Sequence, residues 1–433
     1  MNTICLDLGT TAAKAAAFRG SRRIGGIVSQ STPLRTSGTA AQLDARRMID
    51  LADSLIRAAG RTLGGQVDRI AIAAMSPAVC LLGKTDRPIT PIICHLDRRS
   101  EREALEIAET FGEASLLKTT GNLPIPGGIA STILRWMQRN DAGRYHRATR
   151  VAPLTTLIVG HLTGRYICDP GTGTFLGVLD IRNMQPWRPM LRFLKLAPSS
   201  LPEIRDGGDV AGQVKANLMK KLGLRRRCEV LVGLMDTSAV CCHAGPGPGR
   251  MYNVVGTTDV LAICTRKARP QAGILSRPVG TGPHWLAIST MAAVGAALEW
   301  TYRTFFAELS RRKFYALADR LSVAKQEYEV TFDPDLAGSR MQVRQQYGQI
   351  RNLTLSTLRE DILGALLHSL TKRSERRLQI LRGQAKPDGV VFLAGGATRM
   401  GLQRLWPDIY RTVQLQEDAS LRGLAQLAMT TIG

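Results

Sequence analysis

The chain has 433 residues, which exceeds what a single hydrophobic core usually serves, so its length predicts two domains. Hydrophobic residues make up 44% of the sequence and charged residues 21%, a globular composition that excludes an intrinsically disordered chain. The formal net charge of +23 at pH 7 raises the question of a nucleic-acid partner.

The positive charge gathers in short clusters, which are the kind of feature that contacts phosphates. Only 5% of the residues are aromatic, and the sequence shows neither zinc knuckles nor an aromatic RNA-binding signature. We therefore expect solvated helix faces rather than nucleic-acid binding. The densest clusters are Lys220–Lys221 with Arg225–Arg227, Arg311–Lys313, and Lys372–Arg373 with Arg376–Arg377.

The eight cysteines are scattered and form no Cys-x-x-Cys pair, which is typical of small core residues in a reducing compartment. The N-terminus lacks a basic start, and Asp7 interrupts its apolar run too early for a secretory signal. No stretch approaches the roughly 18 apolar residues of a membrane span. The sequence therefore predicts a cytoplasmic protein without a membrane partner.

The first half of the chain reads as strands joined by tight turns, followed by helices. Residues 3–8 and 12–19 are apolar runs on either side of Gly9-Thr10-Thr11, a pattern that favours a β-hairpin. Residues 44–63 place apolar side chains at helical spacing. Further expected elements are strands at 70–75, 79–82 and 228–234 and helices at 129–137 and 155–162.

The second half repeats this pattern, with apolar runs at 251–255 and 260–264 around Gly256-Thr257-Thr258. Two such arrangements in one chain indicate a duplicated architecture. Strands and helices alternate, so the class is α/β, and we expect domains at 1–242 and 243–433. Further expected elements are helices at 292–309, 358–381 and 421–429 and a strand at 390–393.

Three glycine-containing turns are candidate phosphate-binding loops. In Gly9-Thr10-Thr11, glycine allows a close backbone approach and the threonine hydroxyls add donors, with Asp7 as a possible Mg²⁺ ligand and Lys14 as positive charge. An ordinary hairpin turn explains the same residues. Gly256-Thr257-Thr258 is a second such turn, and Gly395-Gly396-Ala397 follows the strand at 390–393, where a helix N-terminus would favour a nucleotide.

Asp236 follows the expected strand at 228–234 and precedes Thr237-Ser238. A carboxylate at a strand terminus suits a general base. A helix N-cap is an equally good interpretation of the same residues. Local sequence leaves the two alternatives open.

The order of these patterns resembles that of the FGGY carbohydrate kinases, and most closely that of their xylulokinases. The residues that carry the resemblance span essentially the whole chain. They are Asp7-x-Gly9-Thr10-Thr11, Asp97-x-Arg99, Gly233-x-x-Asp236, Gly256-Thr257-Thr258 and Gly395-Gly396-Ala397.

The resemblance implies a two-lobed, actin-like fold of ribonuclease-H-like domains, with ATP, Mg²⁺ and a sugar in the cleft between the lobes. It implies that Asp236 is the general base, that Asp7 and Asp236 surround the metal, and that Ser76 contacts the sugar. Asp97 and Arg99 would either contact the sugar as well or pair with each other structurally. The turns at 9–11 and 256–258, with Lys14, would hold phosphates, and 395–397 would lie beside the adenosine. A homodimer is compatible with this family.

Some positions depart from the family pattern. Pro77 stands where xylulokinases carry a sugar-contacting histidine, His95 replaces a tryptophan, and Met235 replaces a glycine. These departures leave the sugar unidentified. They also keep two alternatives open, namely an actin-like ATPase without a sugar acceptor and a sugar-binding regulatory protein with weakened catalysis.

Overall fold

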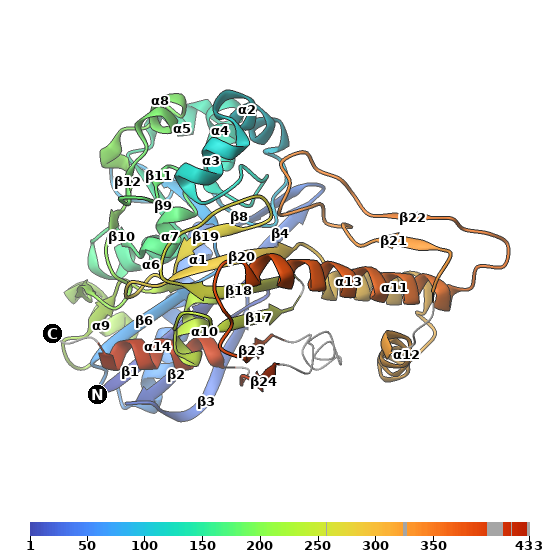
Figure 1. Cartoon of the computed structure of the whole chain (residues 1–433). Coiled ribbons are helices and arrows are strands. Elements are labelled where there is room, and N and C mark those ends of the chain that lie inside the picture. Colours follow the sequence, from blue (N-terminus) through green and yellow to red (C-terminus); the bar gives the residue numbers. More distant parts are fainter. Residues whose placement is uncertain (257, 324–326, 396–409, 417, 431–433) are drawn as a thin grey trace. The chain divides into compact units, whose positions relative to one another are not determined.

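The computed structural model describes residues 1–256, 258–323, 327–395, 410–416 and 418–430 (Figure 1). The chain forms two compact units, and each joins segments that are distant in sequence. Unit 1 contains Met1–Pro246, Ser276–Trp285 and Asp418–Gly433, and unit 2 contains Gly247–Leu275 and Leu286–Glu417. The predicted two-domain α/β class is confirmed, whereas the boundary near residue 243 stays a prediction.

Unit 1 is built on a sheet whose strand order is β14-β15-β6-β1-β2-β3, with β16 also paired to β6. The expected hairpin is present as β1 and β2, which pair antiparallel, while β6 runs parallel to β1, β15 and β16. Parallel neighbours bring their carboxyl ends to one edge of the sheet. The strands are β1 (Asn2–Leu8), β2 (Ala12–Arg19), β3 (Arg22–Ser31), β6 (Arg69–Ala74), β14 (Val210–Gln213), β15 (Glu229–Leu231) and β16 (Leu234–Met235).

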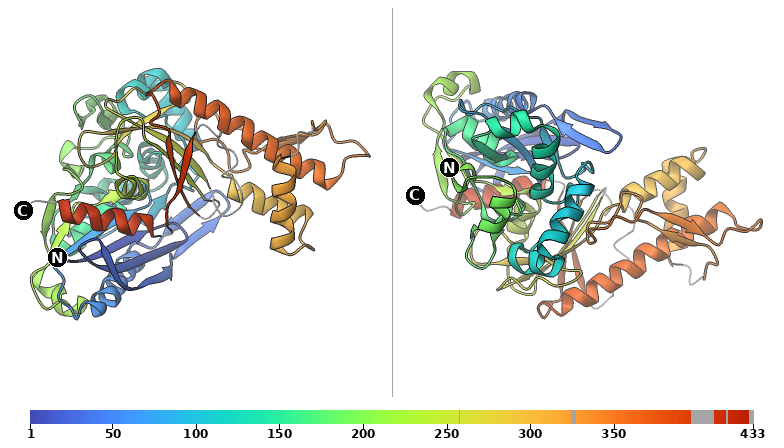
Figure 2. Two further views of the ribbon diagram at one scale, coloured as in Figure 1. Left: turned by 60° about the horizontal axis from the view of Figure 1, so that its bottom comes forward. Right: turned by 90° about the horizontal axis from the view of Figure 1, so that it is seen from above.

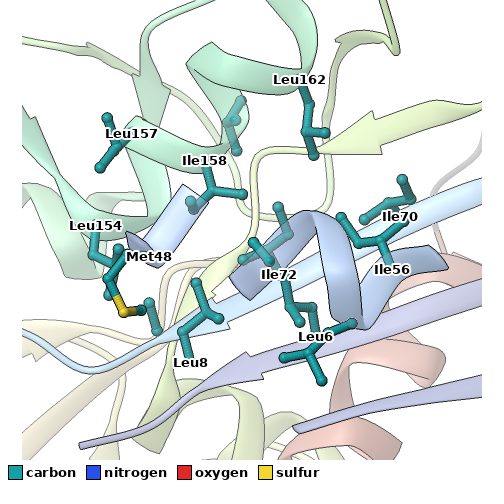
Figure 3. Close-up of a cluster of buried hydrophobic side chains, with 14 of the residues drawn as sticks. Leu6, Leu8, Met48, Ile56, Ile70, Ile72, Leu154, Leu157, Ile158 and Leu162 are labelled. Carbon is teal, nitrogen blue, oxygen red and sulfur yellow. The ribbon is translucent and has the colours of Figure 1, made fainter. Parts of the chain in front are cut away.

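Helices cover both faces of this sheet. On one face, α1 (Ala45–Thr62) and α6 (Leu154–Thr163) pack apolar side chains against β1 and β6, as Figure 3 shows for Leu6, Ile56 and Ile158. On the other face lie α10 (Asp236–Ala244) and α14 (Ala419–Thr430), which are packed side by side (Figure 2). Asp44 caps α1 by accepting from the backbone N–H groups of the first turn.

A second sheet of unit 1 has the order β4-β5-β8-β7-β9, and helices with a core of their own cover it. Its strands are β4 (Leu34–Ser37), β5 (Ala40–Leu43), β7 (Ala78–Leu82), β8 (Ile92–Cys94) and β9 (Arg150–Pro153). The remaining helices of the unit are α2 (Glu101–Phe111), α3 (Glu113–Thr120), α4 (Ala130–Asn140), α5 (Ala142–Arg147), α7 (Pro170–Thr174), α8 (Arg188–Phe193) and α9 (Ala216–Leu222). Short strands are β10 (Ile167–Cys168), β11 (Leu179–Asp180), β12 (Gln185–Pro186) and β13 (Glu203–Ile204), and Pro198–Ser200 forms a 3₁₀ turn.

Unit 2 contains a sheet in which β17 pairs antiparallel with β18 and parallel with β23, and β23 pairs parallel with β24. These strands are β17 (Met251–Val255), β18 (Asp259–Thr265), β23 (Val390–Ala394) and β24 (Arg411–Gln414). The chain leaves unit 2 at β19 (Leu275–Pro278) and enters it again at β20 (Trp285–Met291), and the full strand order of the sheet is β19-β20-β18-β17-β23-β24. The prediction of a single helix at 292–309 is wrong in length. The structure has a shorter helix, α11 (Gly295–Phe305), and a separate helix, α12 (Arg311–Val323), after it. The long helix is α13 (Arg359–Arg382), beside the hairpin of β21 (Thr331–Asp333) and β22 (Gln349–Arg351) (Figure 1).

No helix in the described part of the chain is long and apolar enough to span a membrane.

Candidate functional site

Three polar residues lie at the carboxyl edge of the parallel strands in unit 1. Asp7 in β1 and Leu234 in β16 both pair with Ala73, from opposite sides of β6. Asp236 lies two residues beyond Leu234, and Ser76 lies two residues beyond the end of β6. Adjacent strands are about 4.8 Å apart, so β1 and β16 are separated by about 10 Å. The sheet therefore gathers Asp7, Ser76 and Asp236 at one edge.

Asp236 is the first residue of α10, and the N-cap residue of this helix is Met235. The N-cap interpretation of Asp236 is therefore wrong. Its half-buried carboxylate accepts hydrogen bonds through Oδ1 from the backbone N–H of Thr237 at 2.6 Å and from the Thr237 hydroxyl at 3.2 Å. The local structure fixes this carboxylate at the strand-to-helix junction.

Asp7 is half-buried on the sheet face that α14 covers. The Ser420 hydroxyl of α14 donates a hydrogen bond to Asp7 Oδ2. Burial raises the pKa of Asp7, although the Ser420 hydrogen bond and the charge of Lys14, its cross-strand neighbour, act in the opposite direction. Since burial disfavours the ionised carboxylate of Asp7, a cation beside this residue would stabilise that ionised form.

The turn Gly9-Thr10-Thr11 joins β1 to β2 and is held on both sides. The Thr32 hydroxyl donates to the Gly9 carbonyl at 2.7 Å, and the Thr32 backbone N–H donates to the Thr11 carbonyl at 3.1 Å. A Cβ at Gly9 would lie 2.9 Å from the Ala12 carbonyl oxygen, closer than a side chain tolerates. The residue type at Gly9 is therefore required by the turn itself.

This turn lies beside the end of β6. The backbone N–H of Met75 donates to the Leu8 carbonyl at 3.0 Å, and the Thr10 hydroxyl contacts the Met75 sulfur at 3.7 Å. Ser76 follows at once in sequence. The predicted phosphate-binding turn and the predicted sugar-contacting Ser76 are thus neighbours in the structure.

Unit 2 contains an equivalent turn between β17 and β18. Gly256 N–H donates to the Thr258 carbonyl at 2.8 Å, and the Gly295 N–H at the start of α11 donates to the Gly256 carbonyl at 3.1 Å. Thr257 lies outside the described residues. Asp259, directly after Thr258, pairs with Val255 and closes the turn.

Gly395 ends β23 next to this turn. Its φ of +98° is in the region that favours glycine, and a Cβ there would lie 2.3 Å from the Val255 carbonyl oxygen. Gly396 and Ala397, the other two predicted adenosine-side residues, lie outside the described residues. In both units, therefore, a parallel strand ends beside a glycine–threonine hairpin turn.

A buried ion pair lies next to the unit 2 turn, and the sequence did not predict it. Arg377 of α13 donates to Asp259 Oδ2 at 2.6 Å and to the Ser289 carbonyl at 2.7 Å, and the Asn253 amide donates to Asp259 Oδ1 at 2.5 Å. The Arg377 and Asp259 side chains are 8% and 6% exposed. The expectation that this basic cluster is solvated is wrong for Arg377, which supports the hairpin.

Asp97 and Arg99 form a structural pair. Asp97 is 1% exposed and accepts from the Ala41 backbone N–H at 2.8 Å and from Arg99 Nε at 2.9 Å. Arg99 also donates to Gln42 and lies over the Trp136 ring, with Cζ 4.3 Å from its centroid. These contacts tie β5 to the segment before α2, while the predicted sugar contact of Asp97 and Arg99 stays a prediction.

A further buried carboxyl group, Asp169, lies next to Met235. Its Oδ2 accepts from the Thr172 backbone N–H at 3.0 Å, and Oδ1 has no hydrogen-bond partner among the described residues. Burial raises the pKa of Asp169 to about 7. A Cβ on Gly171 would lie 2.8 Å from Asp169 Oδ2 and 3.5 Å from Met235 Cε. Asp169 is therefore close to the segment that carries Asp236.

Within the described part of the chain, no group of three or more histidine, cysteine, aspartate and glutamate side chains forms a metal-ligand set. Mg²⁺ commonly uses only one or two protein carboxylates and completes its shell with water and phosphate oxygens. Asp7 and Asp236, two half-buried carboxylates at one sheet edge, fit that requirement.

Both halves of the chain match known domain models. Residues 2–242 match the N-terminal domain and residues 251–429 the C-terminal domain of the FGGY family of carbohydrate kinases. A xylulose kinase from Lactococcus lactis is 23% identical over 364 residues, which cover 82% of this chain and 71% of that protein.

Solved structures show the same fold. The structure of ligand-bound xylulose kinase from Lactobacillus acidophilus has a TM-score of 0.87 at 18% identity and covers 99% of this chain and 89% of that one. The structure of Plasmodium falciparum glycerol kinase with ADP has a TM-score of 0.83 at 17% identity and covers 98% and 88%.

Proposed function

Because the chain belongs to the FGGY family of carbohydrate kinases, we propose that it transfers the γ-phosphoryl group of ATP to a hydroxyl of a ketose such as xylulose, or of a related polyol. One observation carries this proposal. Asp7, Ser76 and Asp236 lie at the carboxyl edge of β1, β6 and β16, beside the turn at 9–11. That edge combines a candidate base, a hydroxyl and a phosphate-binding turn.

In this proposal Asp236 is the general base. Its carboxylate accepts the proton of the attacking sugar hydroxyl as the new P–O bond forms, which requires the two oxygens to be about 3 Å apart. The hydrogen bonds from Thr237 hold Asp236 Oδ1 in place, while the half-buried position of the side chain leaves it partly accessible. Positioning of this kind supplies much of the rate enhancement in phosphoryl transfer.

The nucleotide would be held by backbone turns from both halves of the chain. Gly9, Thr10, Thr11 and Lys14 of unit 1, with Gly256, Thr257 and Thr258 of unit 2, would bind the phosphates, and Gly395–Ala397 would lie beside the adenosine. The support is that each described turn follows a strand end and is fixed by backbone hydrogen bonds. Rigid backbone donors cost no reorganisation during the reaction.

Asp7 and Asp236 would hold Mg²⁺. The chemistry that the ion supplies when bound is charge neutralisation at the β- and γ-phosphates. The buried environment that raises the pKa of Asp7 supports this assignment, because a nearby cation offsets the cost of ionising it.

The sugar would contact Ser76, Asp97 and Arg99. Ser76 lies at the same sheet edge as Asp236, and Arg99 is 21% exposed although Asp97 is almost fully buried. We therefore propose that the Arg99 guanidinium reaches the sugar while Asp97 orients it. The identity of the sugar rests on the named relatives alone.

The experiment is a coupled ADP-release assay over ketoses, sugar alcohols and sugar acids, with and without Mg²⁺. For the best sugar, we expect Asp236→Asn to lower kcat at least about 100-fold, the usual contribution of a general base. The control is Asp209→Asn, which alters an exposed carboxylate paired with Arg205 in the same unit. Full turnover by Asp236→Asn would disprove the assigned base.

A second candidate is suggested by Pro77 and Met235, which replace family residues near the sugar and the base. It is an actin-like ATPase, or a sugar-binding protein with weakened catalysis. ADP release that no sugar accelerates favours the ATPase, and sugar binding without ADP release favours the regulatory protein.

A further inference from the structure

Unit 2 contains a cavity that the proposed nucleotide-binding turns do not use. It lies between α13 and the segment 327–332, which leads into β21, and its volume is about 420 Å³. None of the predicted catalytic, metal, nucleotide or sugar residues lines it. The volume is within the range of pockets that bind small molecules.

The cavity has an apolar base and a basic wall. Val330, Phe332 and Ala365 are buried and supply the apolar surface. His368, Lys372 and Arg376 are exposed and follow one another at intervals of four residues along α13. Residues four apart share a face of a helix, so these three side chains line the same side of the cavity.

The lining carries more basic than acidic side chains: Glu327 is its one acidic residue, and two of the basic residues form no ion pair within the described part of the chain. Arg373, the other basic lining residue, donates to Asp333 and Asp335 at 2.8 Å each. Lys372 and Arg376, by contrast, form no ion pair with any described residue. Two like charges four residues apart on a helix destabilise it, so a bound anion would relieve this repulsion.

Tyr328 fixes the segment 327–332 against α13. It lines the cavity, while its hydroxyl is buried away from solvent. A Cβ on Gly364 would lie 2.3 Å from the hydroxyl oxygen, so the end of the ring packs against the backbone of α13. The hydroxyl therefore faces the helix rather than the cavity.

We propose that this cavity binds a small organic phosphate. Lys372 and Arg376 match the charge of a phosphate dianion, and the planar Arg376 guanidinium can donate two parallel hydrogen bonds to its oxygens. The organic part of the ligand lies over Val330 and Phe332. The volume and the apolar base fit a ligand of metabolite size.

The test is isothermal titration calorimetry of the full chain with glucose 6-phosphate, with inorganic phosphate and glucose as separate arms. We expect glucose 6-phosphate to bind more tightly than inorganic phosphate, and glucose not to bind at this site. The variant K372E/R376E should weaken glucose 6-phosphate binding at least tenfold. The control R266E/K267E changes the same charge at two exposed residues of unit 2 outside the cavity and should bind normally.

Tyr328→Phe keeps the ring and removes a hydroxyl that faces α13 rather than the cavity, so it should bind glucose 6-phosphate with unchanged affinity. Unchanged melting temperatures establish that the variants fold. Equal affinity of K372E/R376E and the control, or no binding of either phosphate at millimolar concentration, would overturn the proposal. Neither result depends on kinase turnover, so the outcome is separable from that of the proposed function.

Discussion

Replacing Arg377 by methionine should destabilise unit 2 more than replacing an exposed arginine of the same unit does. Arg377 and Asp259 are both more than 90% buried and are joined at 2.6 Å, and Arg377 also binds the Ser289 carbonyl. Removing one partner of a buried pair leaves an uncompensated charge, which costs about 3–5 kcal/mol. After the substitution, the Asn253 amide would still donate a hydrogen bond to Asp259 Oδ1, but the carboxylate would lack its buried cationic partner.

The free energy of unfolding is measured by urea titration, and the melting temperature by calorimetry. A loss of 3–5 kcal/mol in a domain of this size corresponds to a decrease of roughly 6–20 °C in melting temperature. The matched control is Arg250→Met, because Arg250 pairs with Asp388 at 3.2 Å and both side chains are about one-third exposed. Exposed pairs contribute about 0–1 kcal/mol, so this control should change stability little.

The double variant Asp259→Asn/Arg377→Met separates charge burial from packing. Without the carboxylate charge, the loss of Arg377 should cost clearly less than in the single variant. The reasoning is refuted if Arg377→Met costs less than about 1 kcal/mol, or if the double variant is no more stable than Arg377→Met.

Two further predictions concern a buried acid and a glycine. Burial raises the pKa of Asp169 to about 7, so the folded chain favours the protonated carboxyl group. The stability that this protonated group contributes is lost as pH rises from about 4 to about 7. Asp169→Asn should therefore gain stability relative to the parent chain over this window, by up to about 4 kcal/mol, and parallel urea-derived pH profiles would contradict the raised pKa. Gly395→Ala forces a Cβ to 2.3 Å from the Val255 carbonyl and should destabilise unit 2 and slow ADP release. Gly389→Ala, where φ is +83° and nothing lies within 4 Å, is its control and should show only the smaller backbone cost, of about 1–2 kcal/mol.

Local patterns predicted the elements whose determinants are local. The hairpin at 3–8 and 12–19 is confirmed, since two apolar runs joined by a short glycine turn are sufficient to specify it. The helix expected from residue 44 begins where Asp44 accepts hydrogen bonds from the first turn. In both cases the interacting groups are neighbours in sequence.

The expected helix at 292–309 shows where local patterns fail. Its apolar spacing continues through Phe306, but α11 ends at Phe305. Phe306 is buried, and the Tyr302 hydroxyl donates to the Leu309 carbonyl at 2.9 Å, so the chain turns before α12. Tertiary packing, which periodicity does not record, determines this boundary.

The candidate site was predictable as residue types but not as geometry. The sequence places Asp236 after a strand but leaves open whether it caps a helix. Only the structure decides this, because it shows Met235 as the N-cap residue of α10. Arg377 was indistinguishable from its exposed basic neighbours, because its partner Asp259 lies 118 residues away. The burial of Asp97 also depends on a distant residue, because its backbone partner Ala41 lies 56 residues away in β5.

The two glycine–threonine turns differ in one chemically decisive position. When Gly9 and Gly256 are matched, Asp7 of β1 corresponds to Val254 of β17, and these residues pair with Ala73 and Ala394 in the equivalent parallel strands. Unit 1 thus combines its turn with carboxylates, whereas unit 2 presents the turn without one at this position. Since a metal ion and an attacking hydroxyl need carboxylates and a phosphate needs backbone donors, the duplicated arrangement is consistent with a division of roles. Asp7→Asn should therefore weaken the Mg²⁺ dependence of ADP release, and Val254→Ala, which removes no charge, should not.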